Sequence, residues 1–317
     1  VASSAYAVNV QPDLVSNAYC SDMMVADWLR TSGRLESTPG CLRRDIAEAL
    51  AQKPLAAAEV INRWNEKKVD WQKAARVQNF VMFGYTIKLL TDYPVDPQST
   101  TSYGLLAHRA PKGGLILDVG AHVGMVTILL SKLNPGARVV AFEPASLNRF
   151  FLELNLALNG ISYIPSSEGE NLHSIKAQDP RAVEVRSEAI AGKEGRKQFG
   201  FVAKDPDQSA LVRRAGLFMS NPMVSTVNTM TLEGVMEQVG ATKVDLMKLD
   251  CEGCEIDALH KYTLKGATAP NFAYVTGEIH DKKDSFPVRD VKRVRYMACN
   301  QKWGMHTTSG TPLCSKE

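Results

Sequence analysis

The stretch "LILDVGAHVGMVT", residues 115–127, constrains the fold more than any other part of the sequence. It opens with a short, nearly continuous apolar run, which is typical of a strand buried on both faces of a sheet. Gly120 and Gly124 follow, and the next residues, "MVTILLSKL", indicate a helix. A strand, a glycine turn and a helix in this order predict the start of a βαβ unit, in which glycines let the backbone pass close to a ligand.

The alternation of strands and helices continues beyond this unit. We expect further strands at 138–142, 182–186, 244–249 and 272–280, and helices at 125–133, 146–160, 231–240 and 254–261. Residues 161–181 have the composition of a polar loop, and residues 203–223 that of an excursion over the sheet edge. Strands that alternate with helices predict a mostly parallel sheet covered by helices.

The N-terminal part has a different character. Residues 1–80 are predicted to be helical, with one helix over 42–52 and a longer one that Pro54 opens and that continues to Trp71. The segment 91–113 is rich in Pro, Ser, Thr and Gly, which predicts a loop or linker. We therefore divide the chain into a helical region, 1–80, and an α/β domain, 81–317. The helical region is interpreted as a lid over a substrate site or as the contact for a protein partner.

Charge and hydropathy exclude some classes of partner. The net charge of the 317 residues is +3, too weak to predict binding to nucleic acid. The sequence contains no run of 18 apolar residues, so no transmembrane helix is predicted. The chain starts at Val1 and not at Met, so we expect membrane association, if there is any, only through an N-terminal segment that is missing from this sequence.

The six cysteines leave the redox compartment open. Cys20 and Cys41 are close in sequence, and so are Cys299 and Cys314, so two local disulfides would be natural in an oxidising compartment. Four unconnected thiols in a reduced protein are the alternative. We favour a secretory-pathway lumen over the cytoplasm, although the chain has no Asn-x-Ser/Thr sequon.

Acidic residues at two strand ends indicate the class of cofactor. Asp118 lies just before the glycine turn, which runs from Gly120 through Ala121 to Gly124. A carboxylate there would repel a diphosphate, but it suits a sulfonium with an ammonium group. Glu143 ends the next strand, where it can accept hydrogen bonds from ribose hydroxyls. The pair indicates S-adenosylmethionine, and the absence of G-x-G-x-x-G argues against a nicotinamide oxidoreductase.

A third strand end offers a place for the adenine ring. Glu188 and Ala189 follow the strand at 182–186, in "SEAIAGKEG", where they could bracket an adenine. A plain transition from strand to turn is the alternative.

Four segments together resemble the FkbM-type methyltransferases. They are "DVGAHVGMVT", "AFEP", "SEAIAGKEG" and "TLEGVMEQVGATKVDLMKLDCEGCE", in this order, and the resemblance covers roughly residues 110–282. Its most specific part is "KLDCEGCE". The resemblance implies a class I methyltransferase fold, a Rossmann-like and mostly parallel seven-stranded sheet with helices on both faces. It also implies S-adenosylmethionine as the donor and O-methylation of a glycan or a small natural product. It does not extend to residues 1–80.

The block "KLDCEGCE" follows the strand that should lie beside the cofactor strand, where the methyl group would meet its acceptor. Asp250 is our first candidate to orient the acceptor or the charged end of the donor, and Glu252 the second. Lys248 is expected to neutralise an acid or to extend out of the strand. Glu278 and His280 alternate with Ile279, so both face the same side, and His280 is a candidate general base.

Other interpretations of this block remain. Asp250, Glu252, Glu278 and His280 carry the ligand atoms that a hard cation takes, although we expect no metal. Cys251 and Cys254 lack the partners of a zinc site or a thioredoxin-like context, so we interpret them as small core residues. The main functional alternative to an enzyme is a methyltransferase-like subunit that is catalytically inactive and serves assembly.

Overall fold

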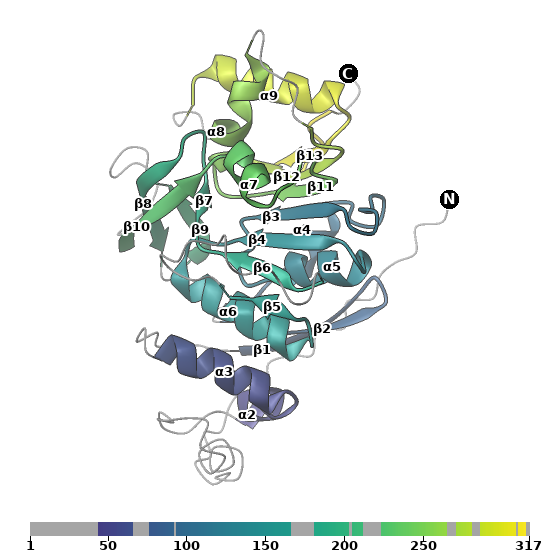
Figure 1. Ribbon diagram of the computed structural model, residues 1–317, viewed down its shortest axis with the longest axis vertical. Coiled ribbons are helices and arrows are strands. Elements are labelled where there is room, and N and C mark those ends of the chain that lie inside the picture. Colours follow the sequence, from purple (N-terminus) through teal and green to yellow (C-terminus); the bar gives the residue numbers. More distant parts are fainter. Residues whose placement is uncertain are drawn as a thin grey trace.

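A parallel sheet of seven strands forms the centre of the protein in the computed structural model (Figure 1). The structure describes residues 44–65, 76–91, 93–165, 181–202, 205–211, 223–264, 271–280, 286–308 and 310–314. The strands, in their order across the sheet, are β13 (Gly304–Thr307), β12 (Val275–Ile279), β11 (Leu246–Leu249), β3 (Leu115–Val119), β4 (Arg138–Phe142), β6 (Val183–Arg186) and β5 (Tyr163–Ile164). All neighbouring strands run parallel. The predicted parallel sheet is therefore confirmed.

Helices cover both faces of this sheet, because successive strand residues point to opposite sides. Ile116 packs among the apolar residues of α5 (Met125–Leu133) and α6 (Ser146–Leu158). Its neighbour Leu117 packs on the other face, against α7 (Leu232–Gln238), α8 (Cys254–His260) and α9 (Val288–Asn300). A short 3-10 helix, η2 (Lys261–Thr263), follows α8. Among the described helices, none has the length and apolar character needed to cross a bilayer.

The strand order reverses its direction at β3, and this determines where a ligand can bind. From β3 the chain proceeds to β4 and β6 on one side, and then returns to β11 and β12 on the other. The helices that follow β3 and β11, α5 and α8, therefore lie on opposite faces of the sheet. In open α/β sheets, ligands bind in the crevice at such a point.

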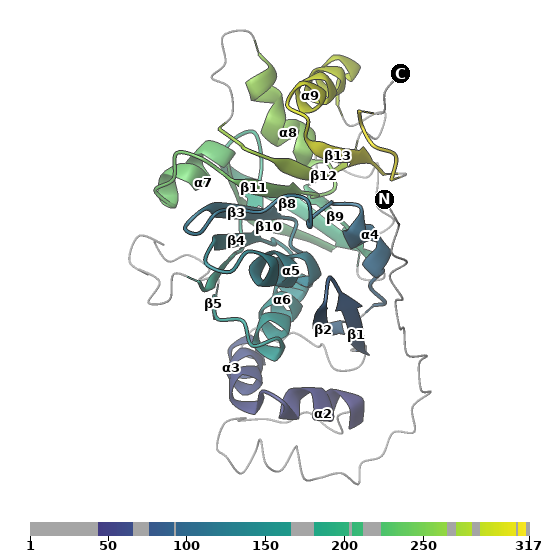
Figure 2. The ribbon, with the colours of Figure 1, turned by 90° about the vertical axis from the view of Figure 1, so that its right-hand side faces the viewer.

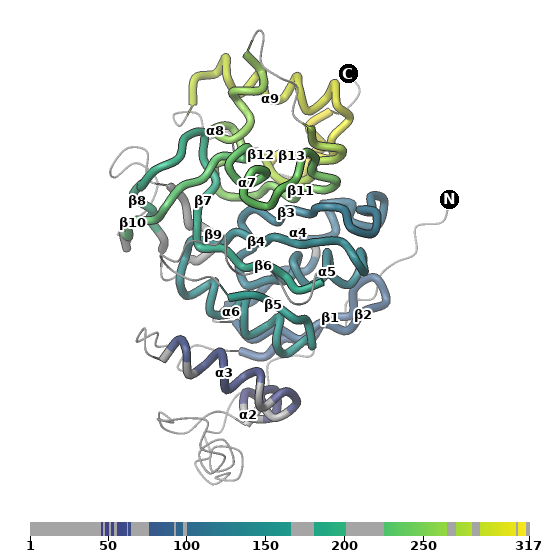
Figure 3. Tube along the Cα trace, in the orientation of Figure 1, coloured from purple at the N-terminus to yellow at the C-terminus, as the bar shows by residue number. Residues whose placement is uncertain are grey.

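Two helices beneath α6 and a hairpin beside it form an N-terminal layer (Figures 2 and 3). The helices are α2 (Arg44–Ala51) and α3 (Pro54–Asn65), and the hairpin pairs β1 (Arg76–Met82) with β2 (Tyr85–Thr91). Trp64 of α3 is buried against Phe150 of α6, and its indole N–H donates to the buried Glu153 carboxylate at 2.7 Å. The helices predicted at 42–52 and from Pro54 are confirmed as far as Asn65, whereas the continuation to Trp71 lies outside the described residues.

Two predictions about this part of the chain need correction. Residues 76–80 are not helical but begin β1, so the boundary drawn at residue 80 cuts through a strand. The segment 91–113 is not a simple linker, because it contains α4 (Pro97–Thr101) and buries Thr100 and Tyr103.

A second, four-stranded sheet lies beside the central one, and the sequence analysis did not predict it. Its strands are β7 (Ala189–Ile190), β10 (Met223–Met230), β8 (Gly195–Val202) and β9 (Asp205–Leu211), in this order. The predicted excursion at 203–223 thus includes β9, while residues 203–204 and 212–222 lie outside the described part. The short β7 connects this sheet to the carboxyl edge of β6, next to the predicted adenine position.

Candidate functional site

The glycine turn after β3 lies directly against the turn after β11. Gly120 has a φ of 78°, and a Cβ atom at this position would lie 1.9 Å from the carbonyl oxygen of Asp250. Gly124 precedes α5 with a φ of 92°. Only glycine adopts such conformations readily. Gly120 therefore allows two stretches of backbone to meet at the edge of the sheet where a ligand is expected, whereas Gly124 leaves room for Leu152 of α6.

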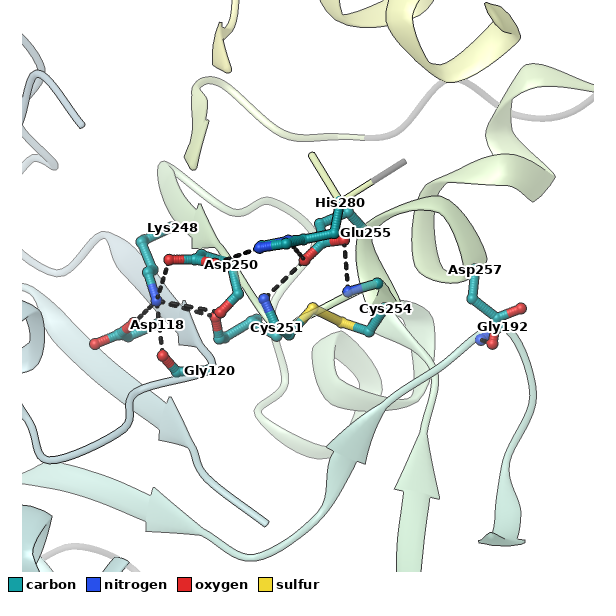
Figure 4. Close-up of a disulfide and its surroundings, with 12 residues drawn as sticks. Asp118, Gly120, Gly192, Lys248, Asp250, Cys251, Cys254, Glu255, Asp257 and His280 are labelled. Atoms are coloured by element: carbon teal, nitrogen blue, oxygen red, sulfur yellow. Dashed lines mark hydrogen bonds and ion pairs between the residues drawn. A yellow bond between two sulfur atoms is a disulfide. The ribbon is translucent and has the colours of Figure 1, made fainter. Parts of the chain in front are cut away.

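Lys248 links three parts of this edge (Figure 4). Its ammonium group donates to the carbonyl oxygen of Gly120 at 2.7 Å, and it lies 3.8 Å from Asp118 and 3.6 Å from Asp250. Asp118 is fully buried and accepts a hydrogen bond from Thr127 at 2.6 Å. Burial raises the pKa of Asp118 in spite of the nearby Lys248 charge. Asp118 therefore supports the turn from below, and Lys248 lies between it and Asp250.

Glu143 fixes the turn from the end of β4. One of its carboxylate oxygens accepts the backbone N–H of His122 at 2.8 Å, and the other accepts that of Ala145, also at 2.8 Å. The side chain is buried, which raises its pKa, although these two bonds act in the opposite direction. Each oxygen keeps a further lone pair, so the carboxylate can still accept hydrogen bonds from a ligand.

A cavity of about 370 Å³ opens at this edge of the sheet. This volume lies within the range of small-molecule sites, about 300–1,000 Å³. Of the residues predicted at the site, ten line the cavity: Gly120, Ala121, Glu143, Glu188, Ala189, Lys248, Asp250, Glu252, Glu278 and His280. Asp118 and Gly124 are not among the lining residues, so the direct contact predicted between Asp118 and a ligand is replaced by support through Lys248.

His280, which lines the cavity, lies among four carboxylates. Its Nε2 atom is 3.2 Å from Glu252, 3.6 Å from Glu278 and 3.9 Å from Asp250. On the other side of the ring, Nδ1 lies 3.1 Å from Glu255. Glu255 is fully buried and also accepts the backbone N–H groups of the preceding turn. The structure thus places Glu255 behind the site, where it supports His280 and the turn after β11.

This arrangement shifts the pKa values of two side chains. Burial and the charge of Asp250 raise the pKa of Glu278 to about 7, although His280 acts against this. Burial alone would lower the pKa of His280, but Glu255 and Glu252 outweigh it and raise this pKa to about 11. At neutral pH, His280 is therefore a cation, whereas Glu278 can gain or lose a proton.

Three aromatic side chains of the cavity escaped the sequence analysis. The hydroxyl of Tyr103 donates to the Asp250 carboxylate, and the hydroxyl of Tyr93 lies 2.7 Å from a ring nitrogen of His122. All three line the cavity. Burial lowers the pKa of His122 to about 3, so its ring is neutral. The sequence feature that could have identified His122 as a site residue is its position inside the glycine turn.

Asp250, Glu255 and His280 also offer possible metal-ligand atoms, all within 4.8 Å of one another. The two carboxylate oxygens of Glu255, however, accept the N–H groups of Cys251 at 2.7 Å and Gly253 at 3.0 Å. These bonds, together with the contact to His280, account for the geometry of the cluster without an ion. The prediction of a site without a metal stays a prediction.

Cys251 and Cys254 lie in the turn after β11, residues 250–253, and at the start of α8; this segment is called the active-site turn below. They are not simply the small core residues that the sequence predicted. Cys251 and Cys254 form a disulfide, and both line the cavity. A separation of three residues brings two such side chains within reach when the chain turns sharply between them, as it does here. Cys299 and Cys314 form a second disulfide among the described residues, so for this pair the local disulfide is confirmed over two unconnected thiols. Cys20 and Cys41 lie outside the described residues.

Comparison with known proteins identifies the family. Residues 118–302, more than half of the chain, match the family model of the methyltransferase FkbM domain. The chain belongs to the FkbM methyltransferase family. The matched residues include the glycine turn, the end of β4, the turn after β11 and the end of β12. The resemblance stated from the sequence motifs is thereby confirmed, and S-adenosylmethionine is the methyl donor of this fold.

Two curated relatives are similar to parts of the chain. One is the AMB antimetabolite synthetase AmbE of Pseudomonas aeruginosa, 28% identical over 197 residues, which are 55% of this chain and 9% of that protein. The other is the methyltransferase sdnD of Sordaria araneosa, 24% identical over 157 residues, which are 47% of this chain and 60% of that protein. The chain thus spans less than two thirds of the length of either relative.

Solved structures of methyltransferases show only a distant likeness. An O-methyltransferase from Bacillus cereus, solved in complex with SAH, has a TM-score of 0.32 at 13% identity, over 86% of both chains. A SAM-dependent methyltransferase from Agrobacterium tumefaciens has a TM-score of 0.28 at 12% identity, over 55% of this chain and 39% of that one. These scores are too low to carry an argument about function.

The described residues fit S-adenosylmethionine. Glu143 keeps free lone pairs at the cavity for the ribose hydroxyls, and Glu188 and Ala189 line the side where the adenine was predicted. Gly120 and Ala121, which carry no large side chain, line the cavity beside them. Lys248 is already engaged with Gly120 and two carboxylates, so it does not confront the cationic donor as a free charge.

Proposed function

We propose that this FkbM-family methyltransferase transfers a methyl group to a hydroxyl oxygen of a glycan or a small natural product. The observation that carries the proposal is Glu278, a carboxylate at the end of β12 that lines the cavity and has a pKa of about 7. A hydroxyl group is a poor nucleophile unless a base accepts its proton while the new bond forms. A carboxylate whose pKa lies near the working pH suits this role.

Bound S-adenosylmethionine supplies an electrophilic methyl carbon, and the side chains of the cavity act on the acceptor. Glu278 accepts the proton of the attacking hydroxyl. Asp250 orients the acceptor by accepting a hydrogen bond from a neighbouring hydroxyl. Burial would raise the pKa of Asp250, but Lys248 and His280 outweigh it and lower this pKa, so Asp250 remains a carboxylate. Correct orientation of the acceptor supplies a large share of the rate in such a transfer.

His280 is a weaker candidate for the base than the sequence suggested. With a pKa of about 11 it already carries a proton at neutral pH. Its charge instead holds Glu252, Glu278 and Asp250 close together, within 3.9 Å of its Nε2 atom. These three carboxylates can accept hydrogen bonds from several hydroxyls of one molecule, which supports a polyhydroxylated acceptor such as a glycan.

We also propose a compartment for this protein and a protein partner. The two disulfides support an oxidising compartment, such as a secretory-pathway lumen. The N-terminal layer packs against α6 and against Val123 of the glycine turn, and we propose it as a docking surface for a protein partner. We expect no nucleic acid among the partners, because the net charge is +3.

The test is product analysis with an isotope-labelled methyl donor and a panel of sugars and hydroxylated natural products. Each acceptor is paired with its deoxy counterpart, and tandem mass spectrometry locates the label. We expect label on oxygen, only where the hydroxyl is present. Glu143→Gln should lose turnover because it weakens donor binding, whereas Glu48→Gln, on the exposed side of α2, should not.

Two results would contradict the proposal. Label on nitrogen, sulfur or carbon would show another reaction class. Tight donor binding without turnover on any acceptor would favour the inactive assembly subunit.

A further inference from the structure

The disulfide of the active-site turn forms part of the cavity wall. Cys251 follows Asp250 directly, and Cys254 precedes Glu255, so the bridge closes the turn that carries Glu252 (Figure 4). Cys251 is partly exposed to the cavity, whereas Cys254 is buried. The bridge therefore lies in the wall of the same cavity that would receive the donor and the acceptor.

The turn inside the bridge has an unfavourable backbone conformation. Glu252 has a φ of 55° and Gly253 a φ of 107°. The left-handed region is costly for a residue with a side chain, and it persists where the surrounding structure enforces it. Two constraints enforce it here: the bridge, and the Glu255 carboxylate that accepts the N–H groups of Cys251 and Gly253. Opening the bridge removes one of these two constraints.

The turn is also in contact with the donor site. The carbonyl oxygen of Asp250 lies where a Cβ atom of Gly120 would be, and the ammonium of Lys248 donates to the same carbonyl at 3.3 Å. A shift of the turn would therefore move the glycine turn beneath the donor as well as the carboxylates that face the acceptor.

We propose that the Cys251–Cys254 bridge is a site of thiol–disulfide exchange that controls methyl transfer. A thiolate of a dithiol reductant attacks the Cys251 sulfur, and Cys254 leaves as a thiolate that takes up a proton. The second thiol of the reductant then attacks the mixed disulfide and releases Cys251. The protein gains two electrons and two protons, the reductant becomes a disulfide, and the opened turn binds the donor less tightly.

This inference rests on the donor site and not on the identity of the acceptor. Because the opened turn binds the donor less tightly, donor binding and reduction oppose each other. By linkage, the factor by which reduction weakens donor binding must equal the factor by which bound donor disfavours reduction. We expect this factor to be about tenfold, within the usual range for coupled sites.

The experiment measures both factors on the full chain. The protein is equilibrated in dithiothreitol buffers of graded redox ratio, thiols are trapped by alkylation, and peptide mass spectrometry gives the reduced fraction of each bridge. Calorimetry gives the affinity for S-adenosylhomocysteine in the oxidised and the reduced protein. We expect about tenfold weaker binding after reduction, and an equal displacement of the Cys251–Cys254 equilibrium when S-adenosylhomocysteine is saturating.

Two double variants assign the effect to one bridge. Cys251→Ser with Cys254→Ser should bind S-adenosylhomocysteine with the affinity of the reduced protein, whatever the buffer. Cys299→Ser with Cys314→Ser, which removes the bridge between α9 and the C-terminal segment, should keep the full redox response. If the first variant does not fold, the Cys251–Cys254 redox equilibrium of the unaltered chain, measured with and without S-adenosylhomocysteine, tests the proposal by itself.

Three results would overturn the proposal. One is equal affinity in both redox states. Another is a Cys251–Cys254 equilibrium that S-adenosylhomocysteine does not displace. The third is loss of the circular dichroism signal together with reduction of this bridge, because the bridge would then be a structural staple.

Discussion

Gly120 has no room for a side chain, and this gives a sharp test of the contact between the two turns. In Gly120→Ala the new methyl group would meet the Asp250 carbonyl at 1.9 Å. Gly113→Ala is a matched control, because Gly113 has the same φ of 78° and nothing lies within 4 Å of its Cβ position. We expect Gly120→Ala to lower the free energy of unfolding by about 3 kcal/mol and the control by about 1 kcal/mol.

Urea unfolding measures the stabilities of these two variants, and calorimetry measures their affinity for S-adenosylhomocysteine. Donor affinity should fall only in Gly120→Ala. If the two variants behave alike, the cost belongs to the left-handed backbone and not to the contact with Asp250.

Glu278 should determine the acid limb of the pH–activity profile. The base must be deprotonated, and the pKa of Glu278 is about 7, so the rate should fall about tenfold per pH unit well below that value. Glu278→Gln removes the base, and we expect kcat to drop by about 10²–10⁴ and the limb near pH 7 to vanish. Rates from pH 5 to 9 at saturating donor test this. The exposed control Glu237→Gln should keep the profile, and a limb that survives in Glu278→Gln would assign it to another group.

Single residues of the site could be predicted from the sequence where they follow an apolar run. Asp250 and Glu278 are such residues, because the end of a buried parallel strand marks the edge where ligands bind. Tyr103 could not be found in this way. It lies in a segment without periodicity, and its role exists only through Asp250, 147 positions later in the sequence. The pKa values of Glu278 and His280 likewise depend on neighbours that only the fold assembles.

At the scale of elements, one buried amide connects the N-terminal layer to the donor site. Asn155 of α6 donates to the carbonyl oxygens of Leu90 in β2 and of Val123 in the glycine turn, at 3.1 and 2.8 Å. Its own oxygen accepts the N–H of Leu90 at 2.7 Å. Asn155→Leu keeps the size of the side chain but leaves three buried backbone groups without this partner.

We expect Asn155→Leu to lower the free energy of unfolding by at least about 3 kcal/mol, because each unsatisfied buried group costs about 1–3 kcal/mol. Denaturant unfolding measures the change, with Asn300→Leu at the exposed end of α9 as the control. A loss below 1 kcal/mol would show that the polar groups find other partners.

The elements that were predicted differ from those that were missed in how strong a local pattern their residues form. The strands and helices of the central sheet show continuous apolar runs or helical periodicity. The β1–β2 hairpin was missed although its signal was present: Phe83 and Gly84 form a two-residue turn with positive φ values of 53° and 82°. The second sheet has a weaker signal, since β9 is largely polar and β8 pairs with β10, which begins more than 20 residues later in the sequence.

The whole molecule should respond to the donor as one unit. The cavity is lined by residues from Tyr93 to His280, which come from the N-terminal loop and from both sides of the central strand. A ligand that binds only the folded state at 100 times its Kd adds about 2.7 kcal/mol to the free energy of unfolding. We therefore expect S-adenosylhomocysteine to raise Tm by a few degrees and to slow hydrogen exchange at the ends of β3, β4, β11 and β12 together. Protection limited to the glycine turn would contradict a shared site.

The reversal of strand order at β3 has a consequence for synthesis on the ribosome. The glycine turn at 120–124 emerges early, but the other wall of the cavity, residues 248–280, is made more than a hundred residues later. Domains generally fold as their chain becomes available. During that interval the nascent chain has the turn that cradles the donor but not the turn that closes it. We therefore expect S-adenosylmethionine to stabilise the fold only after β12 has left the ribosome.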